Sequence, residues 1–437
     1  MLDSLYTEAI KKKGLISEPI KEIEESKIDL ESNWFDEEIP LLDNKPIISA
    51  GDGSYNKKKY LAFNFYAVAA ESLIFNPNET GGEKLKTIES VELNITEHHN
   101  YLEERLRNMM SVLEKKTAIK TFKEYDIDYY LDDGSLMGDL IRPIPADKSL
   151  SPEFKQYLIN QVKDVIEDDI ENSDEIRLID FKNEFKNIFQ QNISFSSKSE
   201  AKSEDNELSE DNSGNDLKSD VNNNSIDSSG NQKIEESIDK NQSTLESFLL
   251  AETQSEEENK DEKNLENEQL DEADLISFLE TIENLIALKH LLKYKRKIVA
   301  ISKTSSSNGL FHANIPDMAI LDRFTSKEGF SKPYYRKVSS KVKRDFPIGN
   351  EFFRELTFTI FFARLKDNKN IIKIELPYYA KEEDIKRVLS DIKRDSTDGY
   401  PFLLKKAHHD VVITNQDMVS LSNIIGFLDK SGREMLN

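Results

Sequence analysis

The spacing of apolar residues along the chain predicts a protein that mixes strands with helices. Short apolar or aromatic runs bounded by polar residues predict strands at residues 45–54, 59–75, 87–94, 125–136, 298–302, 356–365 and 371–376. Apolar residues at helical spacing predict helices at residues 95–122, 154–189, 270–294 and 381–394, with another beginning at Pro401. Helices that alternate with strands are typical of the α/β class, so we predict a sheet flanked by helices.

Two connecting regions add detail to this prediction. The first 35 residues carry apolar positions at helical spacing, and we predict helices that are interrupted at Gly14 and Pro19. Residues 54–58 are predicted to form the turn between the first two strands, which places a run of lysines at the tip of a hairpin.

The middle of the chain has a different composition. Residues 194–268 consist mainly of Ser, Asn, Asp, Glu and Lys, with almost no aromatic residues. Such a stretch buries too little apolar surface to offset the conformational entropy that folding removes. We predict a disordered or weakly helical acidic insert, which is a solvated spacer, a lineage-specific expansion or a segment that imitates the charge of DNA. Residues 1–193 and 269–437 are then two parts of one domain.

The net charge of −24 is concentrated in this insert. Residues 201–280 contain 24 acidic and 6 basic residues, which leaves 59 acidic and 53 basic residues and a net charge of −6 elsewhere. Binding of a polyanion depends on Lys and Arg, so the total charge alone would argue against nucleic acid. Because most of the acid lies in the insert, the rest of the protein can still present a basic face.

The composition excludes several kinds of chemistry. The chain has no Cys, which rules out disulfides, thiolate catalysis and Cys-ligated metals, so any metal must be held by oxygen or imidazole. No GxxxxGK[ST] phosphate loop occurs, which argues against a nucleotide-driven motor. No apolar run approaches the roughly 18 residues of a membrane span. The N-terminus also lacks the apolar core of a signal peptide, so we expect a cytoplasmic protein without membrane contact.

Two Asp-Gly-Ser tripeptides are the main candidates for function. Asp52, Gly53 and Ser54 follow the apolar run that starts at residue 46, and the same tripeptide begins at Asp133 after the run 125–131. Either tripeptide alone is typical of a β-turn. Two carboxylates at the ends of neighbouring strands, however, are an arrangement that holds a divalent cation at the rim of a sheet. We therefore expect Asp133, rather than Asp132, to face a metal, because it precedes Gly134 as Asp52 precedes Gly53.

A carboxylate from the helix at residues 95–122 could complete this site. Three carboxylates without Cys form a hard, oxygen-rich site that suits Mg²⁺ or Mn²⁺. One or two such ions bound to a phosphodiester stabilise the attacking and leaving oxygens during hydrolysis. The chain has 83 acidic residues, so carboxylates near strand ends also arise by chance. His408 and His409 are equally compatible with a solvated helix, Lys303 with a charge at a strand end, and Tyr400 with a core aromatic residue.

The order of these elements resembles the NurA family of archaeal nucleases. The matching pieces are PIISAGDGS, MMSVLEKK, DYYLDDGSL, IVAISKTSSS, FFARLKDNKNIIKIELP and GYPFLLKKAHHDVVIT, which are spread over residues 46–414 in the family's order. The resemblance implies an RNase H-like fold, with a mixed sheet flanked by helices. It also implies a metal-dependent phosphodiester hydrolase that uses two Mn²⁺ or Mg²⁺ ions per site.

The resemblance assigns roles to particular residues. Asp52, Glu114, Asp133 and His408 match metal ligands, with Glu103 and Glu104 as alternatives for the helix carboxylate. His408, rather than His409, is implied to face the metal. Lys303 and Tyr400 match residues that orient the phosphate at the catalytic centre.

The resemblance further implies partners and a biological role. It indicates a homodimer that works with a hexameric HerA-type ATPase on single-stranded DNA and duplex ends. The implied activities are 5′-to-3′ exonuclease and single-strand endonuclease, in DNA end resection and double-strand break repair. One alternative is a catalytically silent adaptor that gates DNA into the translocase ring. Another is a phosphohydrolase acting on small nucleotides.

Overall fold

The computed structural model describes residues 2–25, 29–99, 101–144, 150–186 and 272–427. Within it, the described residues up to Phe185 and from Glu272 onward belong to one compact unit. The predicted acidic insert, residues 194–268, lies outside the described residues. The chain leaves the described region after Lys186 and returns at Glu272, and the Nζ atom of Lys182 lies 2.6 Å from Oε1 of Glu272. The two ends that flank the insert are therefore neighbours.

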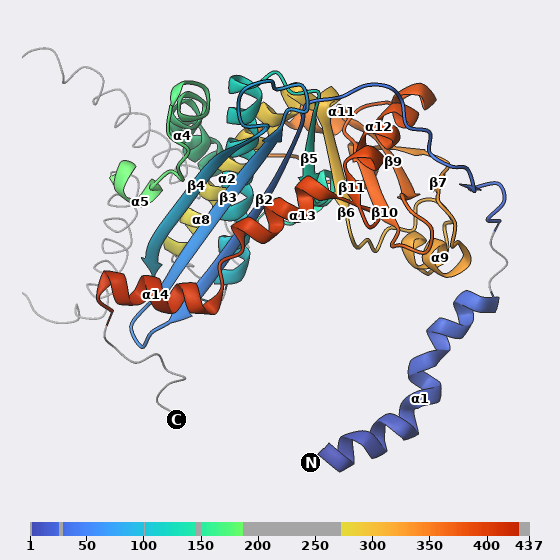
Figure 1. Ribbon diagram of the computed structural model, residues 1–437. Helices are drawn as coiled ribbons and strands as arrows, with labels where there is room; N and C mark the ends of the chain where they lie inside the picture. Colours follow the sequence, from blue (N-terminus) through green and yellow to red (C-terminus); the bar gives the residue numbers. More distant parts are fainter. Residues whose placement is uncertain (1, 26–28, 100, 145–149, 187–271, 428–437) are drawn as a thin grey trace, which may run out of the picture. The chain divides into compact units, whose positions relative to one another are not determined.

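One mixed sheet forms the centre of the fold (Figure 1). Among the described residues it has ten strands, in the order β1-β7-β9-β10-β6-β5-β2-β3-β4, with β8 paired to β9 outside this path. A separate pair, β11 (Ser396–Thr397) and β12 (Tyr400–Pro401), precedes the last two helices. The strands of the large sheet are β1 (Trp34–Phe35), β2 (Ile48–Lys59), β3 (Asn64–Phe75), β4 (Leu85–Thr96), β5 (Tyr129–Asp133), β6 (Ile298–Ser302), β7 (Gly329–Ser331), β8 (Tyr334–Lys337), β9 (Thr357–Arg364) and β10 (Ile372–Leu376).

The middle of the sheet is parallel and its two sides are antiparallel. Strand β2 pairs with β5 in parallel, and β5 pairs with β6 in parallel. The pairs β2–β3, β3–β4, β6–β10 and β9–β10 are antiparallel. The prediction of an α/β, RNase H-like fold with a mixed sheet flanked by helices is confirmed.

Helices cover both faces of this sheet (Figure 1). On one face, α2 (Leu102–Glu124) contacts β2 and β3, α8 (Glu272–Leu291) packs against α2, and α4 (Pro152–Asn172) packs against α8. On the other face lie α12 (Glu382–Arg394), α13 (Phe402–Val411) and α14 (Asn415–Ile425). The remaining helical segments are α1 (Leu2–Glu25), α3 (Leu136–Ile141), α5 (Phe181–Glu184), η2 (Leu292–Lys297), α9 (Asp317–Phe324), α10 (Val338–Lys341) and α11 (Asn350–Glu355).

The strand residues alternate between two cores, as period-2 patterning requires. Ile48, Ala50 and Leu131 pack with apolar residues of α12 and α13 on one face. On the other face, Val68 and Ala70 of β3 pack against the apolar side of α2. Burial on both faces explains why the central strands are short apolar runs.

The first hairpin differs from the prediction. Strand β2 continues to Lys59 and β3 begins at Asn64, so the turn lies at residues 60–63 and not at residues 54–58. The prediction that the strand ends at Ser54 was therefore wrong, and Asp52 lies in the middle of β2. The polar residues that suggested a turn are part of a strand whose pairing with β3 continues through Lys57 and Lys58.

Three predicted helices also have different bounds. Helix α1 runs from Leu2 to Glu25 without a break at Gly14 or Pro19. The helix predicted at residues 95–122 begins only at Leu102, because residues 85–96 form β4. The helix predicted at residues 154–189 ends at Asn172, and the short α5 follows after residues 173–180. Among the described residues, no helix combines the length and apolar character that a membrane crossing needs.

Candidate metal centre

Asp52 and Asp133 lie at the same level on two neighbouring parallel strands. The register pairs Gly51 of β2 with Asp132 of β5, so the next residue on each strand is an aspartate. Asp133 is the last residue of β5, whereas Asp52 lies within β2. The expected meeting of the two carboxylates therefore occurs, although only one of them is at a strand end.

Two glycines allow the backbone around Asp52 to approach its neighbours closely. A Cβ atom at Gly51 would lie 1.9 Å from the hydroxyl of Tyr130. A Cβ atom at Gly53 would lie 2.6 Å from Oε1 of Glu114 on α2. Glycine is thus required here for close packing against β5 and α2, and not for a turn.

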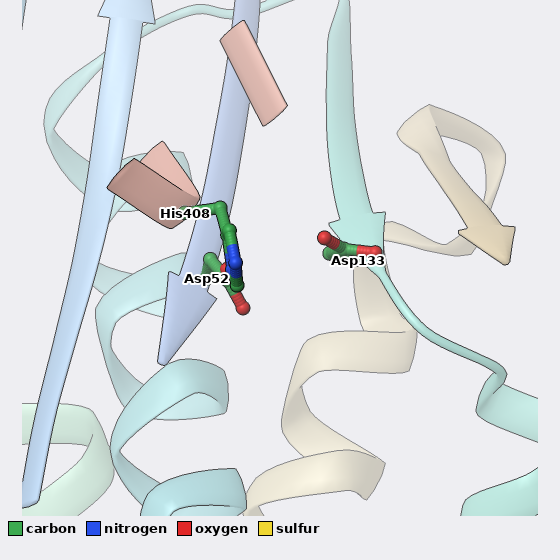
Figure 2. A group of neighbouring side chains, drawn as sticks. All are labelled: Asp52, Asp133 and His408. Carbon is green, nitrogen blue, oxygen red and sulfur yellow. The ribbon is translucent and has the colours of Figure 1, made fainter. Parts of the chain in front are cut away.

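His408 joins Asp52 and Asp133 from helix α13. Its Nδ1 atom lies 2.7 Å from Oδ2 of Asp52. Figure 2 shows the imidazole beside Asp52, with Asp133 facing both from the end of β5. One ligand atom from each of the three residues lies within 4.8 Å of the other two, which is close enough for all three to hold one metal ion.

Only the first of the two adjacent histidines takes part in this group. The side chain of His408 is 58% exposed and contacts Asp52, whereas that of His409 is 89% exposed. His408 is thus the histidine that lies beside the two aspartates, and its role as a metal ligand stays a prediction. The α13 helix places successive residues about 100° apart, so two neighbouring histidines cannot face the same point.

Lys303 and Tyr400 both contact Asp133. The Nζ atom of Lys303 lies 2.6 Å from Oδ2 of Asp133, and the Tyr400 hydroxyl donates a hydrogen bond of 3.3 Å to Oδ1. The ammonium group of Lys303 also lies 5.0 Å from the centre of the Tyr400 ring. The structure therefore brings five of the six predicted site residues together: Asp52, Asp133, Lys303, Tyr400 and His408.

Glu114 approaches the same region from the opposite face of the sheet. Its carboxylate lies under Gly53, and burial, Asp132 and Asp52 raise its pKa well above the usual value. Among the described residues, the three-ligand group does not include Glu114. The alternative Glu103 is half-exposed and forms an ion pair of 2.8 Å with Lys57, while Glu104 is exposed. Glu114 is thus the helix carboxylate that reaches Gly53, the residue next to Asp52.

The electrostatics of the group favour a bound cation. Burial raises the pKa of Asp52, and the neighbouring charge of Asp133 raises it further, while His408 lowers it. Burial and Asp133 also raise the pKa of the Tyr400 hydroxyl. Two close carboxylates in a partly buried site repel each other, and a divalent cation relieves that repulsion. Oxygen and imidazole donors suit Mn²⁺ and Mg²⁺, so the residues present fit the implied metal.

A buried ion pair on β10 fixes the loop that follows Asp133. Glu375, which is fully buried, accepts hydrogen bonds from the Ser135 hydroxyl at 2.8 Å and from the Met137 amide at 3.1 Å, and it pairs with Lys373. Ser135 in turn caps α3 by accepting from the Gly138 amide at 3.0 Å. Sequence reasoning missed this pair. The available signal was a Lys and a Glu at alternate positions of an otherwise apolar strand, where both side chains must be buried.

Comparison with known proteins relates the chain to one family. The family model of the NurA domain matches residues 46–413. A probable DNA double-strand break repair nuclease NurA from Methanocaldococcus jannaschii is 28% identical over 403 residues, which cover 89% of this chain and 80% of that protein. The DNA double-strand break repair nuclease NurA of Sulfurisphaera tokodaii is 31% identical over 170 residues, which cover 39% of this chain and 50% of that protein.

Solved structures share the fold. The crystal structure of the NurA nuclease from Sulfolobus solfataricus matches with a TM-score of 0.62 and 20% identity, covering 98% of this chain and 97% of that chain. A crystal structure of NurA bound to dAMP and manganese matches with a TM-score of 0.55 and 18% identity, covering 98% of both chains. Because the family model matches most of the sequence, the chain belongs to the NurA family.

Proposed function

We propose that this chain is a metal-dependent DNA nuclease that hydrolyses phosphodiester bonds during the repair of double-strand breaks. The observation that carries the proposal is the convergence of Asp52, Asp133 and His408 from β2, β5 and α13 on one point. The names of the relatives and the manganese in a structure of the same fold support it.

In this proposal, Asp52, Asp133 and His408 hold the metal, and Glu114 contributes a third carboxylate from beneath the sheet. The bound Mn²⁺ or Mg²⁺, two ions in the full site, would supply a hydroxide-like nucleophile and neutralise charge on the phosphate. The side chains orient one another without the ion as well. When Nδ1 of His408 donates its proton to Asp52, the other ring nitrogen is left unprotonated and is able to bind a metal or accept a proton.

Lys303 and Tyr400 act on the substrate in this proposal. Both contact Asp133 through polar groups at the ends of their side chains. The Lys303 ammonium lies at 2.6 Å and the Tyr400 hydroxyl at 3.3 Å. Asp133 would hold the metal through these same carboxylate oxygens, and the Lys303 ammonium would then be able to contact a phosphate oxygen. The Tyr400 hydroxyl then orients the neighbouring phosphate by a hydrogen bond.

Family membership supports finer proposals. We infer 5′-to-3′ exonuclease and single-strand endonuclease activity, a homodimer, and cooperation in the cytoplasm with a hexameric HerA-type ATPase in DNA end resection. Duplexes with one end blocked by phosphorothioate linkages test the polarity. Sedimentation of the purified chain, alone and with such an ATPase, tests the assembly.

Substitution of Asp133 tests the catalytic proposal. Asp133→Ala should lower Mn²⁺-dependent cleavage of labelled single-stranded DNA by at least roughly a hundredfold while the protein stays folded. Asp126→Ala is the matched control, because its side chain is 99% exposed and lies before the other end of β5. Cleavage by Asp133→Ala at the wild-type rate would sink the site assignment. Absence of Mn²⁺ binding and cleavage in the wild-type protein would favour the silent adaptor instead.

A further inference from the structure

An open pocket of about 350 Å³ lies away from the metal centre. Its lining includes Lys295, Arg296, Phe352, Glu355, Tyr378 and Tyr379. These residues come from η2, which precedes β6, from α11, which precedes β9, and from the segment that follows β10.

This pocket and the metal centre lie at opposite ends of the central strands. Strand β6 starts at Ile298, directly after Arg296 and Lys297, and it ends at Ser302, directly before Lys303. Since β5 and β6 are parallel, Asp133 and Lys303 lie at the same end of the sheet, and the pocket lies at the opposite end. Five residues of strand span roughly 17 Å, so one small ligand cannot occupy both sites.

Aromatic rings provide a stacking surface at the pocket. Tyr379 stacks on Tyr335 with ring centroids 4.4 Å apart and an angle of 22° between the rings. Tyr379 is nevertheless 61% exposed and Tyr335 is 42% exposed. Exposed, parallel rings of this kind are the platforms on which unpaired bases stack.

Two cations, Lys295 and Arg296, line the same pocket. The guanidinium of Arg296 lies 5.4 Å from the centre of the Tyr378 ring, in a cation–π contact. In the basic run at residues 293–297, Lys293 pairs with Glu171 and Lys297 pairs with Asp126. Within the described parts of the chain, no carboxylate forms an ion pair with Lys295 or Arg296.

We propose that this pocket binds a segment of single-stranded DNA at a second site, separate from the metal centre. A base stacks on Tyr379, and the adjacent phosphates contact Lys295 and Arg296. Exposed aromatic rings beside unpaired cations are the combination that holds single strands without regard to sequence. Glu355, which also lines the pocket, accepts a hydrogen bond from a base N–H group, such as the N3–H of thymine. The proposal rests on the proposed function only in taking DNA as the substrate.

Binding without cleavage tests the proposal. Fluorescein-labelled (dT)20 is titrated with the full chain in EDTA, and anisotropy reports the affinity. Tyr379→Ala should weaken binding roughly tenfold, and Tyr379→Phe should restore it, because stacking needs the ring and not the hydroxyl. Arg296→Ala should weaken binding and reduce the slope of log affinity against log salt by about 0.7.

Matched controls separate this site from general surface effects. Tyr101→Ala removes a tyrosine that is 64% exposed elsewhere, and Lys293→Ala removes a lysine of the same basic run that is already paired. Both should bind (dT)20 like the wild type. If Tyr379→Ala and Arg296→Ala bind as tightly as these controls, the proposal is overturned.

A second substrate distinguishes this proposal from the proposed function. Bis(4-nitrophenyl) phosphate is too small to reach both sites, so its Mn²⁺-dependent hydrolysis reports the metal centre alone. Tyr379→Ala should hydrolyse it at the wild-type rate while binding (dT)20 more weakly. If the wild-type protein fails to hydrolyse it, the nuclease proposal is contradicted. The anisotropy result in EDTA still decides whether the pocket binds single-stranded DNA.

Discussion

The imidazole of His408 lies 2.7 Å from the carboxylate of Asp52, although 356 positions separate the two residues in the chain. Helix α13 packs on the face of β2 that carries Ile48 and Ala50, and Asp52 continues that face. The contact therefore follows from strand alternation together with the packing of the last part of the chain. It makes the candidate metal centre depend on an early strand, β2, and a late helix, α13.

This contact predicts different roles for the two adjacent histidines. His408→Ala should weaken Mn²⁺ binding at least roughly tenfold and lower DNA cleavage, because it removes a ligand and frees Asp52 to rotate. His409→Ala should leave both properties unchanged, since that side chain is 89% exposed. Calorimetric titration with Mn²⁺ measures the affinity. Equal losses in the two variants would show that the helix, and not the imidazole, matters.

The close packing of Gly51 predicts a large effect of one methyl group. Gly51→Ala places a Cβ atom 1.9 Å from the Tyr130 hydroxyl, so it should lower the free energy of unfolding by about 1–3 kcal/mol or more through overpacking. Gly14→Ala is the opposite control, because the residue is helical and a Cβ atom added there meets no atom within 4 Å beyond the neighbouring helix backbone. It should stabilise the protein by up to about 1 kcal/mol. Urea denaturation measures both changes, and a stable Gly51→Ala variant would contradict this account of β2.

A buried cation between three helices predicts a second stability effect. The Nζ atom of Lys116 on α2 lies 2.6 Å from Asp169 on α4 and 2.7 Å from Glu283 on α8. Lys116→Met leaves Glu283 buried without this cation and leaves Asp169 paired only with Arg177, at 3.1 Å, so it should cost about 3–5 kcal/mol. Lys12→Met removes an exposed pair with Glu8 and should cost less than about 0.5 kcal/mol. Chemical denaturation that shows similar stabilities for both variants would be incompatible with a buried triad.

Glu71 predicts a pH dependence of stability. It is buried at 8% exposure beside Asp52, and burial, followed by Asp410 and Glu89, raises its pKa to about 7 despite the opposing effect of Lys406. A carboxyl with a raised pKa binds its proton more tightly in the folded state. Its contribution to stability is therefore complete below the usual pKa of 4.5 and is lost as the pH rises through about 7.

Replacement of Glu71 by the neutral Gln should remove this dependence. In metal-free buffer, Glu71→Gln should unfold at a higher urea concentration than the wild type at pH 8, and the difference should shrink at pH 5. Glu97→Gln alters an exposed residue and should match the wild type at both pH values. A difference between Glu71→Gln and the wild type that does not change with pH would assign the effect to packing.

The class of fold followed from the sequence because apolar periodicity is a local property. Strand β6 was predicted with its exact bounds, and β9 and β10 to within a residue at each end. The turn at residues 60–63 was missed because Asp, Gly, Ser and Asn favour turns locally, whereas pairing with β3 along twelve residues extends β2 through them. Tertiary pairing overrode the local preference.

The candidate site also has a part that local sequence predicted and a part that it did not. Asp52, Asp133, Lys303, Tyr400 and His408 were proposed from short motifs and do converge. Asp52 and Asp133 lie at one level on β2 and β5, and the other three side chains contact them. The support from Glu375 was missed, since its partners Ser135 and Met137 are about 240 positions away. The spacing of apolar residues and the short motifs do not indicate such a contact until the order of the strands is known.

The ion pair between Lys182 and Glu272 has a consequence for the length of the chain between them. Because Lys182 and Glu272 already meet in the folded protein, a connection of any length between them closes a loop without displacing either end. The entropy of closing a flexible loop rises only with the logarithm of its length, so doubling the segment costs about 0.6 kcal/mol. The position between α5 and α8 is thus one where this fold can gain or lose tens of residues with little change in its free energy of folding.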